Sequence, residues 1–521
     1  MSATAIGPEA TVGQRMRGEA LRRAFLHQDG LAVTAALAAL DQTGTLARLS
    51  AGAALPVGEL VAGAAPGAVA ACLRAAHSAG WLTVDNADPD PHRATVRLAD
   101  HSPAAMTALA GYRMVWEAVE GALDGADWAD GADVVARLAE CVPVVQRARA
   151  DVAGSALDPQ RAEIVARHVE GVLATAALPR MANVRQASGA EATAILCALD
   201  LSDGSSPTTL AGYTAFFQPI YGLIGSYARP ILGVPAALAG GAALTPDDVN
   251  GGVDRRINVV ASGAAHRGYF QAANTALRRI FDEQPLADQP RAIVDVGCGD
   301  GRWLREMFDT VTTRTERGRH LDRHPLTVIG VDYSEAALDV AREGLRSAPA
   351  VLLRGDIGDP AAITASIAAA TGLADDDLLH VRAFVDHNRS ISGVDDEAVR
   401  PSTDADPEIC VSPDGALLSR QAIVGDWTRH YRRWSQFSRR HGLLVIEGHT
   451  VAPVELNGRA GGSHGLAFEF YHNLSGQGPL RWESFQAVTA AAGFDRSHLS
   501  LTYPNHARPT TSVQRLVPSA A

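Results

Sequence analysis

A glycine-rich turn between an apolar strand and a helix is the place in this chain that points most directly to chemistry. Residues 291–302 read RAIVDVGCGDGR, and the glycines of the turn are Gly297, Gly299 and Gly301. Glycine at alternate positions lets the backbone turn tightly and lets a ligand approach it without meeting a Cβ atom. Dinucleotide-binding folds use a similar device, so the turn alone predicts a nucleotide-like ligand without specifying it.

Acidic residues accompany three successive apolar strands in the same region. The first strand carries Asp295, a second (LTVIGVD, 326–332) ends in Asp332, and a third (VLLRGD, 351–356) ends in Asp356. A carboxylate at the tip of the second strand is suited to accept hydrogen bonds from both ribose hydroxyls of an adenosine. Taken singly, the glycines could serve only a turn, Asp332 could cap the next helix, and Asp356 could be a loop carboxylate. Their occurrence in this order at successive strand ends favours a cofactor site.

The spacing between the glycine motif and Asp332, with Ser334 just after it, resembles the class I S-adenosylmethionine (SAM) methyltransferases over about residues 295–450. The resemblance implies an α/β fold with a Rossmann-like doubly wound sheet, and SAM as cofactor. It implies that the methionine end of SAM lies near the glycines, the ribose on Asp332, and the adenine beside Asp356 and Ile357. The full set of cofactor-binding residues that it implies is Asp295, Gly297, Gly299, Gly301, Asp332, Tyr333, Asp356 and Ile357.

More polar residues follow the fourth and fifth predicted strands. Because the ligand crevice of a parallel α/β sheet lies at the carboxyl ends of its strands, chemistry is expected there. Each residue alone has a structural alternative, since polar clusters mark sites only statistically. The residues are Asp386, His387, Asn388 and Arg389 after strand four (377–389), Glu447 and His449 in strand five (443–450), and His472, Asn473, Ser475 and Gln477 in the loop expected within 466–480.

The segments HVRAFVDHNR, IEGHT, YHNLSGQ and INVVASGAAHRGYF resemble the metal-dependent C-methyltransferases of modular polyketide synthases. This narrower resemblance implies methylation of an activated carbon next to carbonyl groups, on a small-molecule or carrier-bound acyl substrate. It implies a mononuclear Fe²⁺ or Mn²⁺ ion held by His449 and Gln477, with His472 and His387 in reserve. Such an ion would act as a Lewis acid that stabilises the substrate enolate, and imidazole and amide ligands suit either metal.

Without a metal, the same residues predict a different enzyme. His387 or His449 would serve as general base for a hydroxyl, with Asp386 or Glu447 orienting it. A metal-free small-molecule O- or N-methyltransferase is therefore the alternative. A third hypothesis is a non-catalytic winged-helix regulator that retains SAM binding.

The rest of the chain divides into a winged-helix-like dimerisation and cover module (1–105), a helical lid or connector (106–285) and the cofactor domain (286–521). The module shows a helix (31–49), a helix–turn–helix (58–82) and a two-stranded wing (83–98). Its recognition helix has only two polar side chains long enough to contact DNA, Arg74 and His77. This favours a protein contact and a homodimer over DNA binding. In the lid, the pocket candidates are Tyr213, Tyr221, His266 and Tyr269, and residues 393–415 are expected to form an exposed acidic insertion.

Composition limits the classes of partner. A net charge of −12 over 521 residues is a poor match to nucleic acid, which favours basic surfaces. Five cysteines without CxxC spacing fit a reducing cytoplasm. The first residues lack the apolar core of a signal peptide, and no apolar run reaches the ~18–20 residues of a membrane span. A cytoplasmic protein with no membrane partner is expected.

Overall fold

The computed structural model describes residues 12–50, 52–63, 65–85, 92–181, 189–201, 220–241, 244–389, 391, 410–463 and 465–519. The chain divides into two compact units. The helical unit lies within Met1–Ala265, Thr403–Ser419 and Val451–Gln477, and the sheet unit within His266–Ser402, Arg420–Thr450 and Gly478–Ala521. The predicted division into three parts stays a prediction; the structure adds that two segments from the second half of the chain pack with the N-terminal helices.

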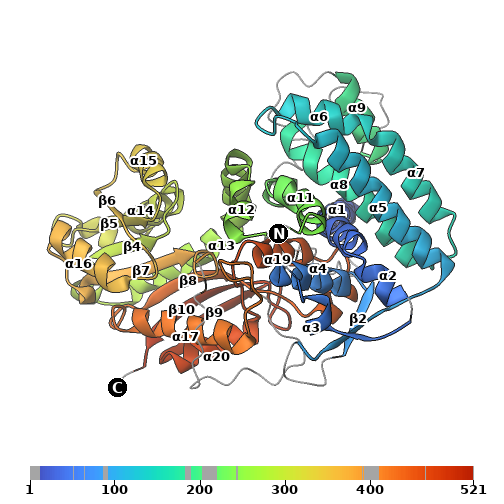
Figure 1. The fold of residues 1–521 in the computed structure, drawn as a ribbon. Helices are drawn as coiled ribbons and strands as arrows, with labels where there is room; N and C mark the ends of the chain where they lie inside the picture. The colour runs from blue at the N-terminus through green and yellow to red at the C-terminus, as the bar shows by residue number, and fades with distance from the viewer. Residues whose placement is uncertain are drawn as a thin grey trace. The chain divides into compact units, whose positions relative to one another are not determined.

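The helical unit contains mostly helices and one small sheet (Figure 1). Its helices are α1 (Val12–Gln42), α2 (Thr45–Ser50), α3 (Val57–Leu60), α4 (Pro66–Ser78), α5 (Pro103–Leu123), α6 (Gly131–Glu140), α7 (Val142–Ala153), α8 (Pro159–Met181), α9 (Gly189–Ala198), α11 (Ala228–Ala239), α12 (Pro246–Gly251), α18 (Pro453–Asn457) and α19 (Gly465–Leu474). The strands β1 (Leu55–Pro56), β2 (Leu82–Asp85) and β3 (Thr95–Leu98) form an antiparallel sheet in the order β1-β3-β2. These elements fall where the sequence predicts a winged helix, which itself stays a prediction.

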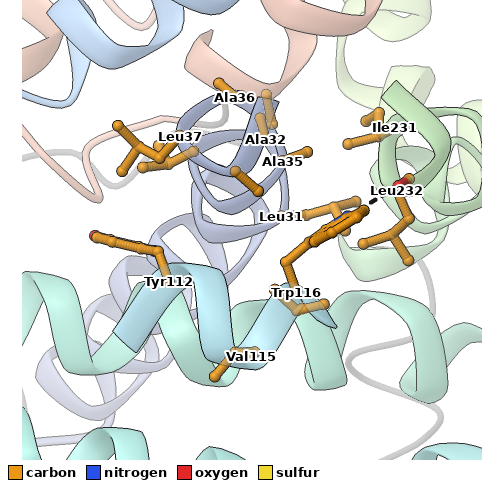
Figure 2. Packing of buried hydrophobic residues seen from close by; sticks show 14 of the residues in the cluster. Leu31, Ala32, Ala35, Ala36, Leu37, Tyr112, Val115, Trp116, Ile231 and Leu232 are labelled. Atoms are coloured by element: carbon orange, nitrogen blue, oxygen red, sulfur yellow. Dashed lines mark hydrogen bonds between the residues drawn. The ribbon is translucent and has the colours of Figure 1, made fainter. Parts of the chain in front are cut away.

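Helix α1 is the centre of the helical unit. Every residue from Ala24 to Leu40 is buried, which is typical of a helix that is apolar on all sides and surrounded by others. It packs against α4, α5, α8, α11 and α19. Figure 2 shows its alanines and leucines beside Tyr112 and Trp116 of α5, where the Trp116 indole N–H donates to the Leu232 carbonyl at 3.0 Å. Removing the first hundred residues would therefore also remove the middle of this core.

Helices α1 and α8 cross with their backbones in very close approach. A Cβ atom on Gly30 would lie 2.2 Å from the His168 carbonyl oxygen, and one on Gly171 would lie 2.1 Å from that of His27. Only glycine fits at such a crossing. The close approach places His27 of α1 against Glu170 of α8, with 3.1 Å between Nε2 and Oε2.

The sheet unit contains a seven-stranded sheet in the order β6-β5-β4-β7-β8-β10-β9 (Figure 1). Strands β4 to β8 run parallel, whereas β10 is antiparallel to both β8 and β9. The strands are β4 (Ala292–Val296), β5 (Thr327–Asp332), β6 (Ala350–Arg354), β7 (Leu378–Ala383), β8 (Leu443–Gly448), β9 (Phe494–Tyr503) and β10 (Thr511–Pro518). The predicted alternation of strands and helices, and hence the α/β doubly wound class, is confirmed.

The central strands are apolar because both faces of the sheet are covered. All residues of β4 and of β8 are buried, and parallel strands covered on both faces are expected to be continuous hydrophobic runs. Helices separate successive strands in the chain: α14 (Arg302–Arg314), α15 (Glu335–Gly344), α16 (Pro360–Thr371), α17 (Arg420–Ser435) and α20 (Trp482–Ala491), and α13 (Arg255–Glu283) precedes β4. The strand order reverses between β4 and β7, so a crevice is expected at their carboxyl ends.

Among the described helices, none is both long and apolar enough to cross a bilayer.

Candidate active site

The glycine turn after β4 leaves open space above its backbone. Gly297, Gly299 and Gly301 all have positive φ angles, of 84°, 54° and 73°. A Cβ atom on Gly297 would lie 2.4 Å from Val385 Cγ1, so this glycine lets the loop after β7 pack closely. A Cβ atom on Gly299 would meet no atom within 4 Å. Gly299 is thus a point where a ligand can approach the backbone.

Asp332, at the end of β5, is bonded to the glycine turn. Its Oδ2 accepts the Gly299 N–H at 2.9 Å, and its Oδ1 accepts the Ser334 N–H at the same distance. The N-cap of α15 is Ser334, whose hydroxyl accepts the N–H of Ala337. Asp332 is therefore not the cap of this helix, which removes one structural alternative raised by the sequence. The structure brings two of the predicted cofactor residues, Gly299 and Asp332, into direct contact.

Asp295 adds a buried carboxyl beneath the same turn. Burial, and next the negative charges of Asp332 and Asp300, raise the pKa of Asp295 to about 8. A carboxyl with a pKa this high is mostly protonated at neutral pH, so the negative charge at the turn comes from Asp332 and Asp300, and this charge favours a cationic ligand. SAM, with its sulfonium and ammonium groups, matches this requirement.

The other predicted cofactor residues lie at the sheet's edge. Strand β6 ends at Arg354, so Asp356 stands in the loop beyond it, where its Oδ1 accepts the Gly358 N–H at 2.7 Å. The Ile357 carbonyl accepts the Trp434 indole N–H at 2.9 Å. Tyr333 is 71% exposed, and the guanidinium of Arg354 lies 5.8 Å from its ring centroid. The side chain of Tyr333 therefore faces solvent and can contact a ligand.

A buried histidine–glutamate pair stands at the carboxyl ends of β7 and β8. His387 Nδ1 is hydrogen-bonded to Glu447 Oε1, and both side chains are almost fully buried. Glu447 Oε1 also accepts the Gly448 N–H at 2.7 Å. Asp386 instead contacts Arg382 at 3.0 Å and His430 at 2.7 Å. Of the two carboxylates that the sequence offers for orienting His387, Glu447 is the one in contact with it.

The turn that carries His387 has an unusual backbone. Phe384 has φ 57°, a left-handed conformation that is rare for a bulky residue and often marks a functional turn. Its N–H donates to the Ile446 carbonyl at 2.8 Å, and its own carbonyl accepts the Asn388 side-chain amide at 2.6 Å. The Phe384 ring stacks on His266, with 3.9 Å between centroids. These contacts hold the strand-to-loop transition just before His387.

Residues 250–514 match the model of a methyltransferase family, the AprA MT2-like domain. The chain belongs to this family. It is a SAM-dependent methyltransferase, and the class I resemblance of its glycine and aspartate motifs is confirmed. The matched residues include the whole seven-stranded sheet except the last residues of β10.

No curated protein matches this methyltransferase significantly. Among solved structures, it is similar to the CMeT domain of the citrinin polyketide synthase, with 13% identity and a TM-score of 0.39 over 80% of this chain and 98% of that one. It is similar to the CurJ carbon methyltransferase, with 13% identity and a TM-score of 0.33 over 79% and 99%. It is also similar to a loganic acid methyltransferase, with 14% identity and a TM-score of 0.29 over 47% and 76%.

The predicted metal ligands of the methyltransferase have protein partners or lie in different units. His449 Nε2 lies 2.8 Å from the Ser512 hydroxyl and its Nδ1 lies 3.3 Å from the Leu480 carbonyl, so both ring nitrogens are engaged. His472 lies on helix α19 rather than in the expected loop, and its Nδ1 donates to the Phe468 carbonyl at 2.6 Å. The Gln477 side-chain oxygen is buried without a hydrogen-bond partner in the described part of the chain.

His449 belongs to the sheet unit, whereas His472 and Gln477 belong to the helical unit. The described residues include no group of three or more His, Cys, Asp or Glu that could hold a metal ion. Because both ring nitrogens of His449 are bonded within the sheet unit, this side chain does not fit a metal ligand in the described arrangement. The metal stays a prediction.

Helix α4, the predicted recognition helix, is covered within its own unit. It packs against α1, α18 and α19, and most of its residues are buried. Arg74 is ion-paired with Glu469 at 2.6 Å, with 5% of its side chain exposed. A helix that reads DNA must present several polar side chains to a groove. The packing of α4 therefore favours the enzyme over the DNA-binding regulator.

The lid candidates fall into different environments. His266 and Tyr269 both contact Phe384, and Tyr269 also meets Tyr503 edge-on at 5.1 Å, so these rings cluster beside the turn that carries His387. Tyr221 instead lies in the helical core, where its hydroxyl is 2.7 Å from His27 Nδ1. Tyr213 and most of the predicted insertion 393–415 lie outside the described residues; the part from Cys410 begins with buried residues.

Three residues near the active site were missed by sequence reasoning. Arg382, His430 and Tyr431 surround Asp386, and all three are fully buried. Arg382 lies in a strand that reads as apolar, and His430 and Tyr431 lie in the Arg-rich helix α17. The available signal was a charged residue, Arg382, near the end of a buried strand, because such a charge requires a buried partner.

Proposed function

We propose that this methyltransferase transfers the methyl group of SAM to an acidic carbon next to carbonyl groups, with His387 as general base and Glu447 as the carboxylate that orients it. The observation that carries the proposal is the buried hydrogen bond between these two side chains at the carboxyl ends of β7 and β8. The resemblance of HVRAFVDHNR and IEGHT to carbon methyltransferases supports carbon as the acceptor.

The pair is suited to remove a proton from a weak acid. With Nδ1–H donating to Glu447, the ring presents Nε2 as the basic nitrogen. When Nε2 takes the proton of the substrate carbon, Glu447 stabilises the imidazolium that forms. This stabilisation is large in a buried site, where little water screens the two charges. General base catalysis of this kind contributes roughly 10²–10⁴-fold to a rate.

The cofactor-binding residues position the second reactant. When bound, SAM supplies an electrophilic methyl group. Asp332 and the open backbone at Gly299 would hold the ribose and methionine parts, and Asp295 would lie near the cationic end. Holding a carbon nucleophile and a methyl group in line supplies much of the rate of a direct displacement.

The acceptor is proposed to be an acyl group, either free or carried by a partner protein. The same pair could serve a hydroxyl or amine acceptor, which remains the second candidate because His387 and Glu447 would act in the same way. We further propose a cytoplasmic homodimer that binds neither nucleic acid nor membrane. Light scattering of the full chain tests the dimer, and salt-dependent duplex binding tests the nucleic-acid expectation.

The experiment uses SAM labelled with ¹³C in the methyl group and the acetoacetyl thioester of N-acetylcysteamine as a carbon-acid probe. The expected product carries the label on the carbon between the two carbonyl groups, as shown by its NMR shift. His387→Ala should lose at least about 100-fold in kcat while SAM affinity is kept. A label on oxygen would support the second candidate, and full turnover of His387→Ala would contradict the assigned base.

The same assay also tests whether methyl transfer needs the metal ion predicted from the sequence. Full activity in excess chelator, with no metal in the protein purified without chelator, would show that the His387–Glu447 pair acts without an ion. Loss of activity that Fe²⁺ or Mn²⁺ restores would support the ion predicted from the sequence.

A further inference from the structure

A second histidine–carboxylate pair lies behind the first in the sheet unit. His430 of α17 places Nε2 2.7 Å from Asp386 Oδ1, and Arg382 of β7 lies 3.0 Å from the same oxygen. All three side chains are buried. Asp386 is the residue immediately before His387, so its anchoring fixes the backbone from which the base projects.

The groups around Asp386 favour an ionised carboxylate that accepts hydrogen bonds. The Arg382 guanidinium, 3.0 Å from Asp386 Oδ1, supplies a positive charge, and the His430 ring adds a hydrogen bond to the same oxygen. Burial, and next the charge of Arg389, lower the pKa of His430 to about 3, although Asp386 opposes this. The imidazole is therefore neutral at physiological pH, and the short contact with a carboxylate places its hydrogen on Nε2. His430 acts here as a hydrogen-bond donor.

Arg382 is itself held in place, so the anchor is rigid. Its guanidinium lies 4.6 Å from the Trp434 ring centroid and 5.4 Å from that of Tyr431, within cation–π range. Trp434 and Tyr431 lie on the same helix as His430. One helix thus supports both partners of Asp386.

We propose that His430 is a positioning residue for methyl transfer, which acts through Asp386 to hold His387 against Glu447. The inference rests on the proposed function, because it assigns a support to the base proposed there. The contacts of Phe384 hold the start of the loop, and the His430–Asp386 contact restrains the position next to His387. A displacement of a catalytic group by about 1 Å can cost on the order of 100-fold in rate.

The test compares His430→Gln with His430→Asn in the acetoacetyl thioester assay. The glutamine amide nitrogen can take the place of Nε2 and donate to Asp386, whereas the asparagine amide is too short and takes the place of Nδ1. We expect His430→Gln to keep kcat within about threefold of the wild type and His430→Asn to lose about tenfold or more, with SAM affinity by calorimetry unchanged in both.

His380→Phe is the matched control for His430→Phe. His380 is equally buried and meets Trp434 edge-on at 5.2 Å, but the described residues that bond Asp386 Oδ1 are Arg382 and His430 and do not include His380. We expect His430→Phe to lower kcat about 10- to 100-fold and His380→Phe to leave it nearly unchanged. Equal losses in the two phenylalanine variants, or equal kcat in the glutamine and asparagine variants, would overturn the positioning role.

The result is separable from that of the proposed function. If His387→Ala is inactive while His430→Phe and His430→Asn keep full turnover, the base stands and the positioning role fails. If His387→Ala keeps full turnover, both fail.

Discussion

Among the described residues, each unit buries one histidine–glutamate pair, and the two pairs have different surroundings. In the helical unit, His27 Nε2 lies 3.1 Å from Glu170, and Tyr221 occupies the other ring nitrogen. Glu170 is also ion-paired with Arg167 at 2.7 Å and with Arg149 at 3.1 Å. In the sheet unit, the described residues give Glu447 no ion pair other than His387, and its Oε2 has no hydrogen-bond partner among them.

The comparison shows how a buried histidine–glutamate pair can stabilise the fold in one place and be suited to catalysis in another. The pair at the α1–α8 crossing lies in the middle of two helices, and two cations offset the charge of Glu170. In the pair at the ends of β7 and β8, Glu447 lies in β8 and His387 lies in the loop after β7, whose first residue, Phe384, has a left-handed backbone conformation. A carboxylate without a fixed cation can respond when its histidine becomes charged, as a general base requires.

Isosteric substitution of the two glutamates is the strongest way to break this comparison. Glu447→Gln should lower kcat by about 100-fold, because the imidazolium loses its counter-charge. Glu170→Gln should leave kcat of the folded enzyme nearly unchanged but lower the free energy of unfolding by about 3–5 kcal/mol, because Arg167 and Arg149 lose a buried partner. Steady-state kinetics and urea denaturation of both variants give the two readouts, and the opposite pattern would reverse the assigned roles.

Asp332→Ala tests whether the carboxylates at the strand ends serve a ligand. Each charge-assisted hydrogen bond to a ribose hydroxyl is worth about 1.5–3 kcal/mol, so SAM affinity should fall by an order of magnitude or more. Calorimetric titration with SAM measures this. Asp309→Ala is the control, because that carboxylate contacts Arg305 on the surface of α14. Unchanged affinity in Asp332→Ala would remove the ribose assignment.

The pH dependence of stability should differ between the two kinds of buried acid. Burial alone would raise the pKa of Glu170, but His27 and Arg167 outweigh it and lower the pKa, so its stabilisation is present above about pH 4.5 and is lost as pH falls below this value. The pKa of Asp295 is raised to about 8, so its effect has the opposite sign. Between about pH 4 and 8 the folded state binds the extra proton, and stability falls as pH rises.

The Asp295 effect is at most about 1.4 kcal/mol per pH unit. Urea denaturation between pH 5 and 8 should show the loss in the wild type, and Asp295→Asn should flatten the slope. An identical slope in the variant would show that another group is responsible. In the same series, Glu170→Gln should change the free energy of unfolding only in its pH dependence below about pH 4.5.

Ser512→Ala should give the smallest effect. Ser512 is a neutral partner of His449, and removing one such hydrogen bond costs about 1 kcal/mol of stability. Turnover should stay within about threefold of the wild type, in contrast to Glu447→Gln. A large loss of turnover together with sensitivity to chelator would place His449 in the catalytic apparatus.

Local patterns made the sheet and the cofactor residues predictable. Each central strand is buried on both faces and so appears as an apolar run, as in β4. The glycine turn comes directly after the end of β4, and Asp332 is the last residue of β5, so both could be located from the strands. The place of a side chain at a strand end can be inferred from the strand alone. This is why Glu447 and His387 were both candidates before the structure joined them.

Contacts between distant segments could not be predicted in this way. His430 lies 44 residues after Asp386, on a helix whose sequence gives no sign of that partner. The sequence likewise placed His472 in a loop beside the sheet, whereas it lies on α19, which packs against α1 and α4. The pairing of segments depends on tertiary packing, which a single sequence does not express as a local pattern.

The chain passes between its two units at five points, after residues 265, 402, 419, 450 and 477. During synthesis, α1 emerges from the ribosome more than four hundred residues before α19, which covers part of it. The apolar surface of α1 and α4 that α19 buries therefore stays uncovered until nearly the whole chain has been synthesised. Segments that expose hydrophobic surface in this way are prone to misassembly. Folding of the N-terminal half should depend on completion of translation, so ribosome-bound chains that end before residue 450 should be far more sensitive to protease than the released protein.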